Sequence, residues 1–454
     1  MRTARSRLIL TALTACLAPI SLVGCATQSE SAAETEPVTT ALNLESFDYV
    51  WTTVDERHYD PDAIGEQWDA ARAEYRPKVE AAETNAQARV LINEMLLTLG
   101  LSHFGIIGAE AYQEIDAGGD PAESRGATGI EVRLIDGQAV VFRVAEGSTG
   151  ADAGIEPGWV LLEIDGRDVA ELIETLSEIE AGPTRPETVI ALRLEGLLRG
   201  SVGDEIELVA LDRADARTEL TLTVGEPLGE IVGMGSLPPS ELVVETETLD
   251  GGIVYLKFNY FLDPVKIITT MRQVAADAQG SPGVIIDLRG NRGGLVNLNN
   301  GIAGFLTDKR DQKIGEMITR ENQLQLQVNP RPGAFTGPVA VLIDEVSISS
   351  AEILSGGLQD LNISHTFGSR TAGLVLPSTI ERLPNGDGFQ YVLTGFRAPS
   401  GRVLEEAGVY PDTPAPLTRE DLIAGRDRAL YEAASWLAML NGVRPTDPGT
   451  VTRN

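Results

Sequence analysis

Basic residues are scarce in this sequence. The 454 residues include 36 lysines and arginines against 67 aspartates and glutamates, so the formal net charge is −31. A surface this acidic repels phosphate backbones and anionic lipid headgroups. We therefore expect no nucleic-acid partner, and solubility is the simplest role of the charge.

A run long enough to span a membrane is lacking near the N-terminus. The uncharged apolar stretch from Leu8 to Val23 is shorter than the ~20 residues that a spanning helix needs. It follows Arg2, Arg5 and Arg7 and ends in Leu-Val-Gly-Cys at Cys25, which resembles a bacterial lipobox. Residues 1–24 are therefore predicted to be a lipoprotein signal peptide and Cys25 the lipidated residue, with a plain secretory signal or a short anchor helix as the alternative.

Thiols are scarce as well. Cys16 would leave with the signal peptide and Cys25 would be acylated, which excludes a disulfide, a cysteine nucleophile and a thiolate metal site. The three histidines are scattered and no H-E-x-x-H motif occurs, so we expect no metal and no cofactor. Ala26 and Thr27 follow Cys25 without an aspartate, which by the sorting rule of enteric bacteria predicts an anchor in the outer membrane, facing the periplasm.

The rest of the chain is typical of a globular protein. Its 43% hydrophobic and 23% charged residues match folded averages, and its length predicts two or three domains. Residues 25–41 are small and polar and predict a flexible tether. Residues 42–118 predict a helical domain, because apolar residues recur at helical spacing from Phe47 to Val54 and from Val90 to Leu99.

The second helical run has a predicted start and end. Thr84 with Gln87 forms a capping box at its start. We expect this helix to end at Gly100. Residues 101–104 are then predicted to form a turn that leads into a short strand at 105–107. A tight loop after a helix can hold a side chain rigidly toward a cleft.

Residues 124–228 change to short β-branched runs bounded by glycine, which predict a β domain. The string GSTGADAGIEPGWVLLEIDGRDV resembles the middle of a PDZ domain, whose exposed strand edge captures an extended peptide and often its terminal carboxylate. Gly126, Thr128, Gly129 and Ile130 are the expected substrate-binding loop. A plain β domain without peptide binding is the alternative.

Residues 237–440 alternate strands and helices. The buried-type strands 252–256, 283–288 and 339–343 are each followed by a helical stretch, as repeated βαβ units require. Active sites of such sheets form beyond the carboxyl ends of the strands. Two chemically suggestive strings stand at those ends.

The first string, Asp287 to Gly294, reads DLRGNRGG. Its glycines let backbone N–H groups approach a ligand oxygen, which suits an oxyanion hole or a phosphate cradle. The spacing differs from that of a dinucleotide fingerprint. The second string, Val346 to Leu354, places Ser349 where a helix begins near Ser350, a position that suits either a nucleophile or an ordinary N-cap.

Together the two strings resemble the tricorn and C-terminal-processing peptidase family of serine peptidases. Similarity continues in LGLSHF, GSRTAG and LEEAGVYPD and extends over nearly all of the chain after the leader. The resemblance implies an α/β multidomain protein with an N-terminal helical segment, a PDZ-like β domain and a crotonase/Clp-like α/β catalytic domain. It implies Ser349 as nucleophile, with the backbone N–H groups of Ser350 and of Gly293 or Gly294 as the oxyanion hole.

Two branches of this family activate the serine differently. The lysine of one branch would stand at Leu374 and is missing. The tricorn-like branch uses a histidine and a late glutamate, which resemblance places at His103 and Glu405, with Ser102 as an auxiliary serine. Glu406 adjoins Glu405 and is the alternative.

The other histidines are expected elsewhere. His58 lies in a charged turn and is expected to be solvated, and His365 is expected on the surface of a helix-to-strand connection. The predicted activity is a serine endopeptidase with protein or peptide substrates. A non-catalytic ligand binder on the same fold and an interaction scaffold built on the PDZ-like part are the alternatives, and the sequence makes no prediction of oligomeric state.

Overall fold

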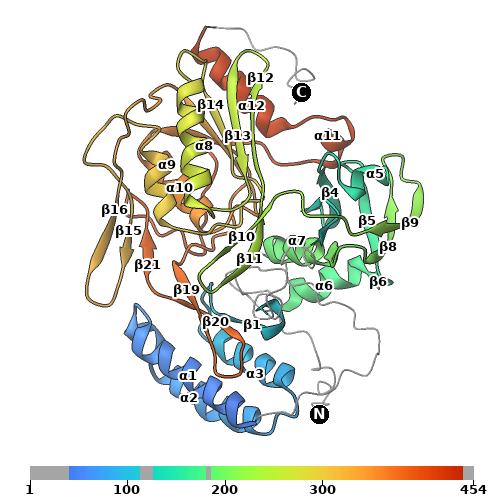
Figure 1. Ribbon diagram of the computed structural model, residues 1–454, viewed down its shortest axis with the longest axis vertical. Helices are drawn as coiled ribbons and strands as arrows, with labels where there is room; N and C mark the ends of the chain where they lie inside the picture. The colour runs from blue at the N-terminus through green and yellow to red at the C-terminus, as the bar shows by residue number, and fades with distance from the viewer. Residues whose placement is uncertain (1–39, 113–125, 180–185, 443–454) are drawn as a thin grey trace, which may run out of the picture.

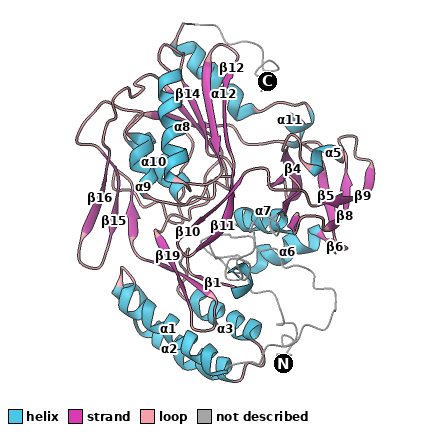
Figure 2. Ribbon diagram, viewed as in Figure 1, coloured by secondary structure: helices cyan, strands magenta, loops and turns pink. Residues whose placement is uncertain are grey.

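The structure is a computed structural model that describes residues 40–112, 126–179 and 186–442 (Figure 1). The predicted signal peptide, the predicted lipidation site Cys25 and most of the predicted tether lie outside the described residues. Within those ranges no helix has the length and apolarity to cross a membrane. The protein is a mixed α/β multidomain molecule, as the sequence predicted (Figure 2).

Three helices form the N-terminal part. They are α1 (Thr40–Arg57), α2 (Pro61–Glu80) and α3 (Asn85–Leu97). The predicted start of α3 is confirmed, because the Thr84 hydroxyl accepts the N–H of Gln87 at 3.0 Å. The Gln87 side chain reaches the N–H of Glu83 at 2.8 Å instead of that of Thr84, so the capping box is only half formed.

A small antiparallel sheet joins the beginning of the chain to its end. Its order is β1-β20-β19, with β1 (Gly105–Ile107), β20 (Gly388–Val392) and β19 (Ser378–Arg382). The short 3-10 helix Ala109–Tyr112 follows β1. Phe389 and Tyr391 of β20 share one buried cluster with Phe47 and Trp68 of the helices, so the N-terminal helices pack on late strands (Figure 1).

The β-rich part between residues 126 and 225 contains a six-stranded sheet in the order β3-β4-β5-β8-β9, with β6 paired to β5. Its strands are β3 (Ile130–Ile135), β4 (Gln138–Val144), β5 (Val160–Ile164), β6 (Arg167–Asp168), β8 (Glu205–Leu211) and β9 (Arg217–Thr223). Helices α5 (Thr149–Asp152), α6 (Val169–Ile179) and α7 (Pro186–Leu197) accompany it. The sequence analysis named the β runs and missed α6 and α7.

The main body is built on a second six-stranded sheet in the order β12-β13-β14-β17-β18-β22, parallel except for β12. Its strands are β12 (Val244–Leu249), β13 (Ile253–Phe258), β14 (Val284–Asp287), β17 (Val339–Ile343), β18 (Ser364–Gly368) and β22 (Thr413–Pro414). The predicted βαβ units are confirmed, since β13, β14 and β17 each lead into a helix. The helices are α8 (Pro264–Asp277), α9 (Asn297–Ala303), α10 (Ser350–Asp360), α11 (Arg419–Ile423) and α12 (Arg428–Leu440).

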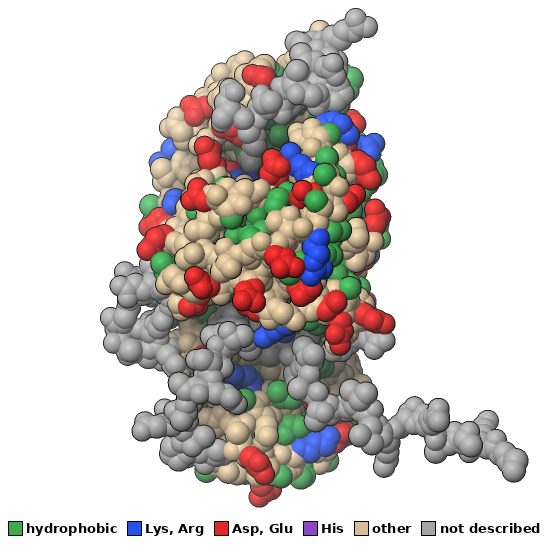
Figure 3. All heavy atoms as spheres, turned by 90° about the vertical axis from the view of Figure 1, so that its right-hand side faces the viewer, with side chains coloured by type: hydrophobic (Ala, Val, Ile, Leu, Met, Phe, Trp, Pro, Cys, Tyr) green, Lys and Arg blue, Asp and Glu red, His purple; other side chains and the backbone are tan. Residues whose placement is uncertain are grey.

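Both faces of this sheet are buried, as a parallel sheet requires. Ile286 faces the core under α8, α9 and α10, whereas its neighbour Ile285 faces the core under α12. This double burial explains the continuous apolar strands of the sequence. Acidic side chains are spread over the face displayed in Figure 3.

Short antiparallel pieces escaped the sequence analysis. They are the hairpin β10 (Glu230–Met234) and β11 (Leu237–Leu242), the sheet of β15 (Lys313–Ile318), β16 (Gln323–Gln327) and β21 (Gly395–Arg397), and the pair β2 (Gly126–Ala127) and β7 (Arg199–Gly200). Their short or largely exposed strands give a weak periodic signal.

Candidate active site

Two adjacent parallel strands carry the two glycine- and serine-rich strings. β14 ends at Asp287 and leads into the glycine loop, and β17 ends at Ile343 and leads through a turn into α10. Because β14 and β17 are paired in parallel, both strings emerge at the same edge of the sheet. The structure therefore brings them together beyond the strand ends.

A cavity of about 330 Å³ lies at this place. Ser349, His103 and Ser102 all line it, together with Gly294 and Leu374. The structure thus gathers residues from the N-terminal helical part, the glycine loop and the start of α10 around one cavity.

Ser349 has an unusual backbone. It is the N-cap of α10 with φ 56° and ψ −114°, a conformation that costs a non-glycine residue about 1–3 kcal/mol. Its N–H donates to the Leu374 carbonyl at 2.9 Å and to Glu352 Oε2 at 3.1 Å. These contacts fix the turn, so the side chain of Ser349 stands in the cavity at a helix N-terminus.

The two predicted oxyanion glycines differ in their surroundings. A Cβ on Gly293 would lie 2.7 Å from Cβ of Ser349, so only glycine fits beside the serine. The N–H of Gly293 already donates to Asn291 Oδ1 at 2.9 Å. Gly294 lines the cavity, and its carbonyl accepts the Ser350 hydroxyl at 2.9 Å. This geometry favours Gly294 over Gly293 as an oxyanion donor.

His103 is tied to the predicted acid through Ser102. Ser102 Oγ lies 2.7 Å from His103 Nδ1, and Glu405 Oε1 accepts the N–H of Ser102 at 3.2 Å. The second oxygen of Glu405 accepts the N–H of Val375 at 2.7 Å. Glu406 is exposed, so the structure directs Glu405 rather than Glu406 at this chain of contacts.

Burial controls the protonation of both groups. Desolvation lowers the pKa of His103 to about 4, which leaves the imidazole neutral at neutral pH. Desolvation also raises the pKa of Glu405, although hydrogen bonds from Ser102 and Val375 oppose that rise. A neutral imidazole beside a serine is the state that a general base needs.

The structure differs from the expectations for His58 and His365. The expectation that His58 is solvated is wrong, because its side chain is 1% exposed and its ring stacks on Phe104. Its Nδ1 lies 2.8 Å from the Asp60 carbonyl oxygen, and burial lowers its pKa. His365 lies within strand β18, with Nε2 2.9 Å from Thr413 Oγ1, rather than in a connection.

Glu352 is a buried carboxylate directly behind the nucleophile, and the sequence analysis gave it no role. Besides the N–H of Ser349, it accepts hydrogen bonds from Thr371 Oγ1 at 2.5 Å, from Gly373 N at 2.7 Å and from Leu374 N at 2.9 Å. Burial raises its pKa to about 7 against these hydrogen bonds. Its place three residues after Ser349, the spacing of a capping box, was the signal that could have revealed it.

Replacing Glu352 by glutamine is expected to lower stability and turnover together. The amide keeps one acceptor oxygen and turns an NH₂ group toward N–H donors, so a buried donor loses its partner at a cost of about 1–3 kcal/mol. We expect kcat per labelled active site to fall about tenfold or more, because a small displacement of Ser349 is amplified in the rate. Urea unfolding and kinetics normalised to active sites measure both effects.

Glu420→Gln is the matched control for that variant, since Glu420 is an exposed acid in the first turn of α11. We expect it to behave as wild type. A normal kcat per active site in Glu352→Gln would show that the carboxylate contributes to folding alone.

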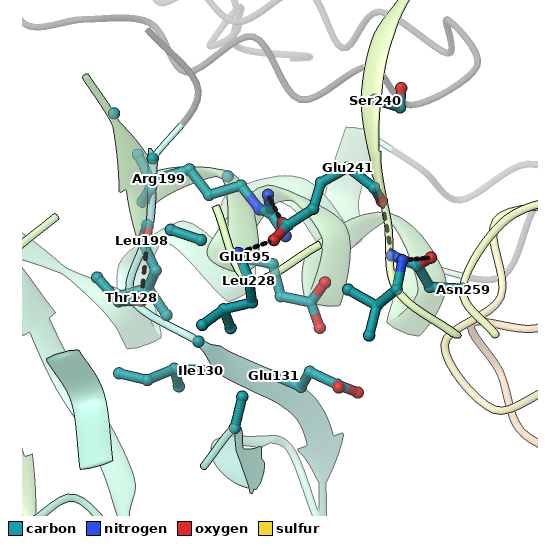
Figure 4. Close-up of a pocket in the computed structure, with 18 of the residues that line it drawn as sticks. Thr128, Ile130, Glu131, Glu195, Leu198, Arg199, Leu228, Ser240, Glu241 and Asn259 are labelled. Atoms are coloured by element: carbon teal, nitrogen blue, oxygen red, sulfur yellow. Dashed lines mark hydrogen bonds and ion pairs between the residues drawn. The ribbon is translucent and has the colours of Figure 1, made fainter. Parts of the chain in front are cut away.

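A second and larger cavity, of about 600 Å³, lies between the β-rich part and the main body (Figure 4). All four predicted loop residues, Gly126, Thr128, Gly129 and Ile130, line it. Thr128 Oγ1 donates to the Leu198 carbonyl at 3.0 Å. Across the cavity, Arg199 pairs with Glu241 at 3.1 Å.

Buried charges hold the β-rich part against the active-site loops. Arg133 of β3, 1% exposed, bonds Asp344 at 2.8 Å and Glu195 at 3.0 Å. Asp344 also accepts the N–H of Gly290 at 3.0 Å, and Glu195 pairs with Arg292. Arg292 lines both cavities, so these ion pairs connect the two sites. No local sequence pattern predicted these ion pairs.

Within the described ranges, no group of three or more histidine, cysteine, aspartate or glutamate side chains is arranged to hold a metal ion. The polar groups around Ser349 are instead a hydroxyl, an imidazole, a carboxylate and glycine N–H groups. That donor set suits acyl transfer.

Comparisons with known proteins identify two segments. Residues 252–415 match the family model described as Peptidase family S41, and residues 42–97 match the Tricorn protease C1 domain. The carboxyl-terminal-processing peptidase 3, chloroplastic, of Arabidopsis thaliana is 25% identical, with 80% of this chain and 67% of that protein aligned. The carboxyl-terminal-processing protease of Synechocystis sp. is 24% identical, with 80% and 78% aligned.

Solved structures share the fold. The photosystem II D1 C-terminal processing protease matches with a TM-score of 0.56 at 20% identity, covering 85% of this chain and 98% of that one. Mature CPAF matches with a TM-score of 0.60 at 14% identity, covering 88% and 97%. With these matches the chain is a serine peptidase. It carries a Peptidase family S41 domain and a Tricorn protease C1 domain, and it is similar to carboxyl-terminal-processing peptidases.

Proposed function

We propose that the protein is a serine endopeptidase that cleaves envelope proteins or peptides through an acyl-enzyme, with Ser349 as nucleophile and His103 as general base. The observation that carries the proposal is the shared cavity, which is lined by both Ser349 and His103, with His103 linked through Ser102 to Glu405. A ligand binder would have no need of this chain of groups.

The proposed chemistry follows from these contacts. With Nδ1 of His103 held by Ser102, Nε2 takes the proton of Ser349 as its oxygen attacks the peptide carbonyl. The oxyanion is held by the N–H groups of Gly294 and Ser350. His103 then gives the proton to the leaving amine, and a water repeats the sequence to release the acid. Glu405 stabilises the imidazolium through Ser102.

We further propose that the chain divides as the sequence suggested. The helical domain covers 42–118, the PDZ-like domain 124–228 and the crotonase/Clp-like catalytic domain 237–440. The sheet with α5 to α7, and the position of Gly126 to Ile130 in the larger cavity, support a module that receives a peptide C-terminus there.

The location of the protein is also a proposal. The arginines, the apolar run and Cys25 support a signal peptide and a lipid anchor, with the domains in the periplasm at the outer membrane. Cys25→Ser should release the protein from the membrane fraction into the soluble fraction. Equal membrane association of both forms would refute the lipid anchor.

An active-serine probe provides the direct test of the activity. We expect a fluorophosphonate to label the wild type at Ser349, located by peptide mass mapping, and the enzyme to release peptides from a periplasmic extract. A binder on this fold would not react. Absence of labelling under conditions where the protein is folded would reject the peptidase mechanism.

A further inference from the structure

Strand β19 has an open edge. The small sheet has the order β1-β20-β19, and no strand within the described ranges pairs with β19 on its other side. An open edge presents unpaired N–H and C=O groups and is a template for another extended chain.

The hydrogen bonds at both ends of the β19–β20 ladder show which residues of β19 bond to β20 and which face the open edge. At one end the N–H of Leu383 donates to the Asp387 carbonyl at 2.7 Å, and at the other the N–H of Leu393 donates to the Pro377 carbonyl at 2.9 Å. Hydrogen-bonded and non-bonded pairs alternate along an antiparallel ladder. The odd-numbered residues of β19 therefore bond to β20.

The even-numbered residues of β19 consequently face the open edge. Ser378 and Ile380 direct their main-chain N–H and C=O groups away from β20. Both residues, with Thr379 between them, line the cavity that contains Ser349 and His103. The open edge is thus a wall of the active site.

The turn of the β10–β11 hairpin also borders this cavity. Gly235, Ser236 and Leu237 line the same cavity, and Leu237 packs against the cluster that contains Ile380. The space is therefore bounded by a strand edge and a hairpin turn. An open strand edge beside Ser349 suits an extended polypeptide, because such a ligand can pair with the edge through main-chain hydrogen bonds.

The side chain of Gln390, which also lines this cavity, has one polar atom without a hydrogen-bond partner in the described ranges. Gln390 is paired with Ile380 across the sheet, and it projects from the face opposite to Phe389 and Tyr391, which lie in the helical core. Its Nε2 donates to Ser378 Oγ at 2.7 Å, while its buried Oε1 has no hydrogen-bond partner in the described part of the chain. An unpaired buried acceptor is costly, and a substrate N–H would satisfy it.

We propose that an extended segment of the substrate adds to β19 as a fourth strand of this sheet, with main-chain hydrogen bonds to Ser378 and Ile380 that present its scissile carbonyl to Ser349. The inference rests on the proposed peptidase function. It defines the ligand as an unfolded polypeptide recognised through its main chain. β1 begins two residues after His103, so the base and the substrate are held by one sheet.

N-methylation of the substrate tests the main-chain pairing without altering the enzyme. The probe is an internally quenched peptide that the wild type cleaves, methylated at one backbone nitrogen at a time. We expect kcat/KM to fall about tenfold or more at alternate positions on one side of the scissile bond, because each lost hydrogen bond and the added methyl act only where the N–H faces β19. Losses without this alternation would overturn the inference.

Ile380→Pro tests the enzyme side, since proline removes one edge-facing N–H and is tolerated at a strand edge. Gln325→Pro is the matched control. It lies on β16, the edge strand of another sheet, and the bond from Thr319 N to the Asn322 carbonyl makes Gln325 edge-facing by the same alternation. We expect peptide kcat/KM to fall about tenfold or more in Ile380→Pro alone.

Probe labelling separates this inference from the function on which it rests. A small fluorophosphonate has no extended main chain, so Ile380→Pro should still be labelled at Ser349 while peptide cleavage falls. If both proline variants cleave the peptide as the wild type does, strand addition at β19 is wrong although the peptidase stands. If the wild type neither labels nor cleaves, both proposals fall.

Discussion

Ser349→Ala is expected to reduce peptide cleavage by about 10⁴-fold or more, which is the usual cost of removing the nucleophile of a serine peptidase. The oxyanion donors and the strand edge remain in this variant, but no oxygen is left to form the acyl-enzyme. The fold should survive, because alanine has the same backbone cost as serine at φ 56° and the main-chain contacts to Leu374 and Glu352 do not involve the hydroxyl. Turnover of a cleaved peptide and thermal unfolding measure the two properties.

Ser355→Ala is the control for loss of a serine in the same helix. Ser355 is buried in α10, and its hydroxyl donates to the Ala351 carbonyl at 2.7 Å. Because the carbonyl already belongs to the helix ladder, we expect a small loss of stability and near-normal turnover. Cleavage by folded Ser349→Ala within tenfold of wild type would assign the nucleophile elsewhere.

His103→Ala is expected to lose about 10⁴-fold in turnover, because the proton of Ser349 then has no acceptor. The removed ring leaves space in the cavity, so added imidazole should restore part of the activity. The second-order rate constant for labelling by the fluorophosphonate should fall in parallel, since that reaction also needs an activated hydroxyl.

His365→Ala controls for loss of an imidazole. His365 is partly exposed on β18 and lies away from the residues that line the active-site cavity. Its turnover should match the wild type. If His103→Ala keeps its labelling rate, another group activates Ser349 and the proposed base is wrong.

Local pattern was sufficient for much of this molecule. The apolar strands 253–258, 284–287 and 339–343 follow from continuous β-branched runs, and Thr84 marked the start of α3. The fold class could be predicted because these signals depend on neighbours in sequence. The catalytic roles came instead from resemblance of the strings around Ser349 and His103 to a family.

Contacts between segments that are distant in the sequence could not be predicted from local sequence pattern. Glu352 had no predicted role, yet it accepts four hydrogen bonds from residues of two loops. Arg133 had no predicted role, yet it is buried and pairs with Glu195 and Asp344. His58 was placed in solvent because its sequence neighbours are charged, while its ring packs on Phe104.

The sequence by itself determined the mixed α/β fold class and the three central strands with the helices that follow them, because these depend on short-range periodicity. Resemblance of the motifs at the strand ends was enough for the peptidase class. Only the tertiary structure decided that Glu405 rather than Glu406 reaches Ser102, that Gly294 rather than Gly293 lines the cavity, and that the edge of β19 borders it. The physical reason is that these choices depend on which side chains and main-chain groups already have partners in the folded chain, as far away in sequence as Glu405 is from Ser102. No local pattern records those partners.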